Sequence, residues 1–461
     1  MQNRILVLML AAGFALAGCG GGGSGSSPSL ASIGSPSGTA GGSGTSPGTN
    51  GGGATGSSGS GGSSGGSSGS GGSGSGSSAT ETVLYAFGTN GSGDGSEPSG
   101  PLVIDSSGNL YGTTALGGSN NTGTVFELTA ASVEHLVYSF GAQGGTDGYS
   151  PNGRLAIDAS GDLLGTTSGG GSGNALNPPD GSGTVFRISP AGAETLLHSF
   201  IQPSTSVDGG QPFSGVVLNA AGDAFGTTSA GGANGTGAVY EVTAAGSESL
   251  LHSFGALGSG DGANPYGGLI MDAAGDLFGE TSSGGATGKG CIFEIPSGGS
   301  ESVLYSFGAS GPADGSVPAG SLSMDSAGNL YGATQYGGAN GTGTIFELTT
   351  AGTEVILHSF GAAGSGDGDG PNGDLLINAA GDIFGTTASG GSSRLSASGG
   401  GEVFEITPTG SYSVLYEFGQ SAASDGQSPH GGLIEDSSGN LYGTTVSGGT
   451  HGDGTVFRIT P

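Results

Sequence analysis

The sequence predicts an all-β protein, a seven-bladed β-propeller of four-stranded blades that is closed by its N-terminal strand. Three observations predict this fold. Residues 81–461 repeat one unit seven times, each unit contains four runs of strand length, and the last unit lacks one strand. No segment shows ten or more residues with helical periodicity, so helices should be nearly absent.

A phenylalanine and a proline mark each repeat. The phenylalanine recurs every 53 to 60 residues, at Phe87, Phe140, Phe200, Phe254, Phe307, Phe360 and Phe418. The proline follows at Pro98, Pro151, Pro212, Pro265, Pro318, Pro371 and Pro429. This period with four strands is close to that of a kelch-type propeller blade. A β-helix is the alternative, but its coils are usually much shorter.

The four runs of the first copy are rich in Val, Ile, Leu, Phe, Tyr and Thr and are bounded by turn residues. They are Val83–Phe87, Leu102–Asp105, Leu110–Thr114 and Thr124–Leu128. The last copy stops after Thr455–Ile459, one strand short, and the array begins with a strand that matches the end of every later copy. We therefore expect Val83–Phe87 to complete the last blade, which removes two exposed edges. Long connections and insertions, such as Asn174–Asp180 and Ser392–Gly399, should gather on one rim.

Residues 1–18 are predicted to be a lipoprotein signal peptide. Arg4 precedes an apolar run, Ile5–Leu16, that is too short for a membrane span. The following Ala17-Gly18-Cys19 completes a string that resembles the bacterial lipobox, which implies lipidation of Cys19. Gly20 after the cysteine, by resemblance to Gram-negative lipoproteins, implies the outer membrane, with a periplasmic or surface-exposed body.

Residues 19–80 are expected to form a disordered tether behind the lipidated Cys19. From residue 20 they are almost entirely Gly, Ser, Thr, Ala and Pro, which bury too little apolar surface to offset chain entropy. The root-mean-square reach of about 60 such residues is about 40–45 Å. Acylation of Cys19 leaves only Cys291, so we expect no intramolecular disulfide.

The charge balance limits the partners. Asp and Glu number 36 against 6 Lys and Arg, a formal net charge of −30. Such a chain has no cationic surface for nucleic acid or for anionic lipid headgroups. We expect contact with the membrane through the lipid anchor only, a glycan or protein ligand, and a monomer.

One slot on the long-loop rim varies while its surroundings repeat. It follows the marker proline and holds Ser99, Asn152, Phe213, Tyr266, Ala319, Asn372 and His430. We interpret these residues either as tolerated loop variation or as a ring of ligand contacts at the channel mouth. His198, His252 and His358 share an outer-strand slot with tyrosines of other blades, so we interpret them as packing residues.

Seven Asp-Gly pairs form the most regular polar feature. They begin at Asp94, Asp147, Asp208, Asp261, Asp314, Asp367 and Asp425. Aspartate suits turns because its carboxylate accepts hydrogen bonds from nearby backbone N–H groups. The alternative is Ca²⁺, for which Asp367 and Asp369 form the densest candidate site. Otherwise we expect no cofactor.

The repeat unit Leu-Tyr-Ser-Phe-Gly, Asp-Gly, Pro, Asp-x-x-Gly-Asn-Leu-Tyr-Gly-Thr-Thr, Gly-Thr-Val-Phe-Glu resembles the GloVer tandem repeat of choice-of-anchor surface proteins over all of 81–461. This implies a surface-displayed repeat protein and supplies no catalytic residues. The sequence itself favours a binding or structural surface module. The alternative is a carbohydrate-active hydrolase or lyase with its site on the long-loop rim, which would need carboxylates that break the sevenfold repeat.

Overall fold

The computed structural model describes residues 79–461, except 173–181, 202–207, 256–259, 312, 362–365, 372, 392–399 and 421–423. The predicted signal peptide, Cys19, nearly all of the tether and the two insertions fall outside this set. Within it the chain is all-β, and its one helix is the 3-10 turn η1 (Gly91–Gly93). No helix in this part of the chain is long and apolar enough to cross a membrane.

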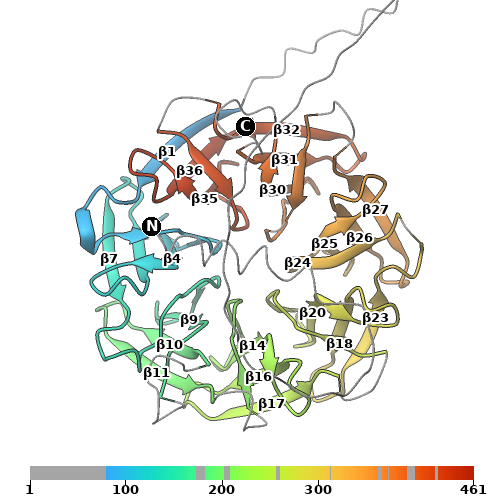
Figure 1. Cartoon of the computed structure of the whole chain (residues 1–461), viewed down its shortest axis with the longest axis horizontal. Coiled ribbons are helices and arrows are strands. Elements are labelled where there is room, and N and C mark those ends of the chain that lie inside the picture. The colour runs from blue at the N-terminus through green and yellow to red at the C-terminus, as the bar shows by residue number, and fades with distance from the viewer. Residues whose placement is uncertain are drawn as a thin grey trace, which may run out of the picture. The chain divides into compact units, whose positions relative to one another are not determined.

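Seven antiparallel sheets of four or five strands form the blades. They surround a common centre, as Figure 1 shows. From the centre outward, blade 1 contains β3 (Val103–Ile104), β4 (Leu110–Thr114), β6 (Thr124–Leu128) and β7 (Glu134–Ser139). Blade 2 contains β8 (Ala156–Ile157), β9 (Leu163–Thr167), β10 (Thr184–Ile188) and β11 (Glu194–Ser199). Blade 3 contains β13 (Val217–Leu218), β14 (Ala224–Thr228), β16 (Ala238–Val242) and β17 (Glu248–Ser253).

The remaining blades follow the same order. Blade 4 contains β19 (Ile270–Met271), β20 (Leu277–Thr281), β22 (Cys291–Ile295) and β23 (Ser302–Ser306). Blade 5 contains β24 (Gly315–Met324), β25 (Leu330–Gly337), β26 (Thr344–Leu348) and β27 (Glu354–Ser359). Blade 6 contains β28 (Gly368–Pro371) and β29 (Leu376–Ile377), then β30 (Ile383–Gly390), β31 (Glu402–Ile406) and β32 (Tyr412–Glu417).

Blade 7 is completed by the N-terminal strand, as the sequence predicts. Its own repeat supplies β33 (Gly426–Pro429), β34 (Ile434–Glu435), β35 (Leu441–Gly448) and β36 (Thr455–Thr460). The outermost strand is β1 (Thr80–Ala86), which pairs antiparallel with β36 from Thr80 opposite Thr460 to Ala86 opposite Thr455. The first and last strands therefore close the ring with backbone hydrogen bonds.

The repeated phenylalanines form the hydrophobic seams between blades. Phe87 is fully buried and meets Phe126 of the next blade edge to face, with ring centroids 5.1 Å apart. The Phe126 ring in turn lies against Gly112, where an added Cβ would approach it to 2.6 Å. The aromatic-Gly-Thr segment therefore has glycine because a neighbouring ring fills the space of a side chain.

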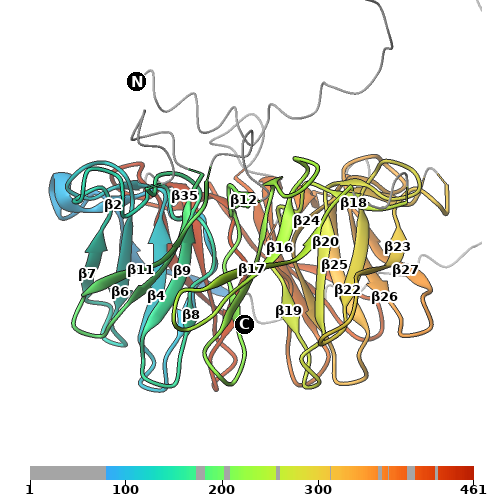
Figure 2. The same ribbon diagram turned by 90° about the horizontal axis from the view of Figure 1, so that it is seen from below.

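The long connections lie on one rim and the tight turns on the other (Figure 2). The long-loop rim carries short ladders that sequence patterns did not predict. They pair β2 (Gly95–Ser96) with β5 (Leu116–Gly117), β12 (Gly209–Gly210) with β15 (Ala230–Gly231), and β18 (Gly262–Ala263) with β21 (Ser283–Gly284). These ladders tie the Asp-Gly loop of each blade to its second loop.

We expect removal of residues 79–86 to lower the melting temperature (Tm), because β36 would then end the sheet as an unpaired edge. Differential scanning calorimetry of the purified protein measures this change. A chain that begins at Ala79 is the control and should keep the Tm of the full chain. Equal Tm values for the two deletions would contradict closure by β1.

Candidate functional site

The innermost strands of all seven blades enclose a cavity of about 500 Å³ along the propeller axis. Its walls are mainly aliphatic, with residues such as Val103, Leu155 and Leu269. Two charged side chains interrupt this lining, Arg154 from blade 2 and Asp374 from blade 6. An apolar cavity with a few polar groups is the usual form of a small-ligand site.

Backbone from adjacent blades packs closely where the chain enters these strands. An ideal Cβ on Gly431 would lie 2.8 Å from the Gly100 carbonyl oxygen, and one on Gly320 would lie 2.8 Å from that of Gly373. No side chain fits there without displacing the next blade. Six blades accordingly have glycine directly after the variable rim slot, and blade 3 has Ser214.

Threonine hydroxyls join the blades at this level. Thr166 donates to the Ser214 carbonyl oxygen at 2.6 Å, and Thr227 donates to that of Gly267 at 2.8 Å. The same bond recurs from Thr113, Thr386 and Thr444. Blade 5 has Ala333 in this slot, and blade 4 has Glu280.

Glu280 breaks the sevenfold repeat. Its residue is 2% exposed, and neither carboxylate oxygen has a hydrogen-bond partner. Burial, and secondarily the negative charge of Asp374, hold the pKa of Glu280 well above its usual range. Sequence analysis overlooked this residue, although a glutamate in place of threonine in the aromatic-Gly-Thr segment was a readable signal.

Asp374 and Arg154 also occupy a repeat slot that sequence analysis left unexamined. The other blades place Pro101, Gly215, Gly268, Ser321 and Gly432 there. The backbone N–H of Ser321 donates to Asp374 Oδ1 at 2.7 Å, and the Ser321 hydroxyl accepts from the backbone N–H of Gly268 at 3.1 Å. This chain of bonds links blades 4, 5 and 6 beside the cavity.

The structure brings four of the seven predicted rim residues together in two pairs. The Ser99 hydroxyl donates to Asn152 Oδ1 at 3.1 Å, across the boundary between blades 1 and 2. The Phe213 and Tyr266 rings, from blades 3 and 4, lie with their centroids 5.5 Å apart. Each pair stands directly before the cavity-lining segments of its blades.

The other rim positions are less informative. Ala319 and His430 are partly buried, and Asn372 lies outside the described residues. Burial lowers the pKa of His430, so the imidazole is neutral near pH 7. Whether these slots contact a ligand stays a prediction.

The Asp-Gly aspartates are turn residues, as one of the two hypotheses expected. Asp94 is 6% exposed, and its carboxylate accepts backbone N–H bonds from Gly88 at 2.8 Å and Gly95 at 2.9 Å. The Tyr85 hydroxyl donates to the same carboxylate at 2.7 Å. Six of the seven aspartates are buried, and Asp367 is partly buried.

The calcium hypothesis finds no converging ligands at its expected place. Asp367 faces His358, whose Nε2 lies 3.2 Å from Asp367 Oδ2, while Asp369 is exposed on β28. Neither belongs to a group of three metal-ligating side chains in the part of the chain that the structure describes. The three histidines of the outer-strand slot each lie beside an Asp-Gly carboxylate of the next blade. Their interpretation as packing residues was therefore incomplete.

The repeats identify the family. The profile of the Gloeobacter/Verrucomicrobia repeat matches residues 175–393 and again 312–461, and the chain belongs to this family. The resemblance noted from the repeat unit is thus confirmed. No curated protein matches the sequence significantly.

Two solved structures share the fold. A streptogramin B lyase is 14% identical with a TM-score of 0.53, over 83% of this chain and 97% of the lyase. A catalytically inactive virginiamycin B lyase from Staphylococcus aureus, solved with quinupristin, is also 14% identical, with a TM-score of 0.52 over 83% of this chain and all of the other. At this identity the likeness extends to the fold alone.

We expect Glu280→Thr to stabilise the protein at pH 8 by about 1–3 kcal/mol, because it removes an unpaired buried carboxyl and restores the hydroxyl of other blades. The raised pKa means that folding favours protonated Glu280. Its contribution is therefore complete below pH 4.5 and is lost as the pH rises toward the folded-state pKa. Thermal unfolding between pH 5 and 9 should show a smaller loss of Tm in the variant.

Glu280→Gln is the control, since it removes the charge but does not restore the threonine hydroxyl. It should share the flatter pH profile and gain less stability at pH 8. A wild-type pH profile in both variants would contradict the buried, protonated carboxyl.

Proposed function

We propose that this protein is a lipid-anchored binding module of the bacterial cell envelope, which takes its ligand at the channel mouth on the long-loop rim. One observation carries the proposal. Rim side chains from neighbouring blades meet in pairs directly before the cavity, although the slot they share varies between repeats. Variable side chains held by a rigid, repeated frame are typical of a binding surface.

The two pairs indicate the ligand's chemistry. Phe213 and Tyr266 offer adjacent aromatic rings, and Ser99 with Asn152 offers hydroxyl and amide groups on the same rim. A sugar ring has an apolar face that stacks on aromatic rings and hydroxyls that bond to such polar groups. The net charge of −30 disfavours acidic polymers. We therefore propose a neutral glycan.

A glycan and peptide array probed with the purified protein tests this function. Phe213→Ala with Tyr266→Ala should weaken glycan binding at least tenfold, because the stacking surface is lost. Tyr336→Ala is the matched control, since Tyr336 is 47% exposed and lies in a different slot. Binding only to peptides, or equal losses in the control, would overturn the proposed ligand class.

The anchor is tested separately. We expect Cys19→Ser to move the protein from the detergent-extracted membrane fraction to the soluble fraction, because the acyl chains alone would hold it there. Fractionation followed by immunoblotting measures this. A variant that stays in the membrane fraction would contradict the lipid anchor.

A carbohydrate-active enzyme is the second candidate, because Glu280 and Asp374 are carboxylates that break the sevenfold repeat beside the cavity. Such pairs cleave glycosidic bonds when one carboxyl is protonated and the other ionised. Glu280 is 2% exposed and is not among the residues that line the cavity, and this burial favours binding over catalysis. Turnover of an array-positive glycan that Glu280→Gln abolishes would favour the enzyme.

A further inference from the structure

The seams between blades repeat one polar cluster outside the channel. Each joins the Tyr/His slot of one outer strand, the Asp-Gly aspartate of the next blade and a glutamate of that blade. At the seam of blades 4 and 5, the Tyr305 hydroxyl donates to Asp314 Oδ2 at 2.9 Å, and Glu354 lies close enough to sense the Asp314 charge. The tyrosine hydroxyl thus supplies a hydrogen bond to a buried carboxylate.

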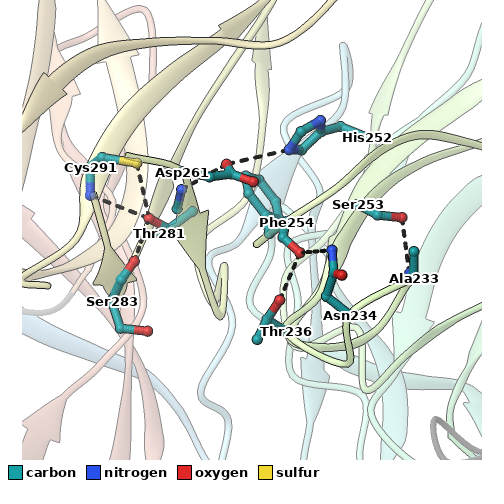
Figure 3. A network of polar contacts seen from close by, with 11 residues as sticks. Ala233, Asn234, Thr236, His252, Ser253, Phe254, Asp261, Thr281, Ser283 and Cys291 are labelled. Carbon is teal, nitrogen blue, oxygen red and sulfur yellow. Dashed lines mark hydrogen bonds and ion pairs between the residues drawn. The ribbon is translucent and has the colours of Figure 1, made fainter. Parts of the chain in front are cut away.

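The seam of blades 3 and 4 has a histidine instead of the tyrosine. His252 on β17 and Asp261 before β18 face each other, with His252 Nε2 at 3.4 Å from Asp261 Oδ1 (Figure 3). Glu301, directly before β23, supplies the third side chain. One ligand atom from each lies within 4.8 Å of the other two.

This cluster leaves four buried ligand atoms without a hydrogen-bond partner. They are His252 Nε2, Asp261 Oδ2 and both carboxylate oxygens of Glu301. The Asp261 side chain is 0% exposed and that of His252 is 11% exposed. Two buried carboxylates with unused oxygens are costly unless a cation or proton compensates them.

We propose that His252, Asp261 and Glu301 bind a Zn²⁺ ion. Imidazole nitrogen together with carboxylate oxygen is a ligand set that suits zinc, whereas Ca²⁺ takes oxygen ligands. Two ligand atoms that each lie about 2.1 Å from a tetrahedral zinc ion are about 3.4 Å apart. His252 Nε2 and Asp261 Oδ1 are separated by this distance, 3.4 Å. The dication neutralises the two carboxylates, and water completes the coordination.

The seam of blades 2 and 3 carries the same set. His198, Asp208 and Glu248 bring one ligand atom each within 4.8 Å of one another, and His198 Nε2 lies 3.4 Å from Asp208 Oδ2. Among the described residues, these two sets of three side chains are the groups whose metal-ligating atoms converge in this way. We therefore assign two zinc ions to each chain, one at the seam of blades 2 and 3 and one at the seam of blades 3 and 4.

The third histidine seam differs and supplies a control. His358 pairs with Asp367, but Tyr412 occupies the glutamate position and stacks on the imidazole with centroids 3.9 Å apart. The carboxylate comes instead from Glu402, which accepts a hydrogen bond from the Tyr412 hydroxyl. Glu402 Oε1 is thus already engaged, and His358, Asp367 and Glu402 are not among the groups whose ligand atoms converge within 4.8 Å, so no zinc is assigned there.

Isothermal titration of the EDTA-stripped full-length protein with ZnCl₂ tests the assignment. We expect two ions per chain, one in His252→Tyr, none with His198→Tyr added, and two in His358→Tyr. Tyrosine is the natural residue of this slot in other blades, so these variants should fold. Zinc should also raise the Tm, because it binds the folded chain.

Co²⁺ provides an independent readout, since its visible absorption reports coordination by these ligands and should halve in His252→Tyr. If circular dichroism shows that a histidine variant is unfolded, Glu301→Gln replaces it and should weaken one site at least tenfold. A folded wild-type chain that binds no zinc, or a double histidine variant that still binds two ions, would overturn the proposal.

Discussion

The close approach of adjacent blades at the channel is the constraint on which the rest of the structure depends. Where Gly431 meets the Gly100 carbonyl oxygen, an added Cβ would lie 2.8 Å from it, which is why six of the seven blades have glycine at this position. The residue before this position then lies on the long-loop rim, and the residues that follow this position line the cavity. A repeated backbone ring therefore presents non-repeated side chains on both sides of itself.

The seams carry a second repeated constraint, made of carboxylates. The N-terminal strand contributes Glu81 to these carboxylates. Besides burial, the negative charge of Asp425 raises the pKa of Glu81, as the charge of Asp314 raises the pKa of Glu354. Burial, and then that charge, raises the pKa of Glu81 to about 7. When the ring closes, β1 thus gives blade 7 both its outermost strand and the Glu81 carboxyl beside Asp425.

Much of the fold could be predicted because the repeat is long and regular. The expected strands Leu110–Thr114 and Thr124–Leu128 agree with β4 and β6, and the closure is confirmed. The innermost strand is shorter than Leu102–Asp105, because Asp105 turns the chain by accepting backbone N–H bonds from Ser107 and Asn109. The Asp105 carboxylate therefore ends this strand earlier than the apolar pattern of the sequence indicates.

The site was less predictable because its groups come from different blades. The rim slot was readable, since one position varies within a constant motif. His252 lies on β17, whereas Asp261 and Glu301 lie just before β18 and β23, and the interpretation of His252 as a packing residue considered one strand alone. Glu280 was readable only as a glutamate in a threonine slot, and its burial beside Asp374 could not be seen in the sequence.

Hydrogen–deuterium exchange of the intact protein tests the closed ring most directly. A closed ring predicts that the amides of Thr80–Ala86 in β1 exchange as slowly as those of Glu134–Ser139 in β7, because each is the outermost strand of its blade and pairs with one neighbouring strand. Exchange of the Thr80–Ala86 amides at the rate of an unpaired chain, with the Glu134–Ser139 amides protected, would contradict the closed ring.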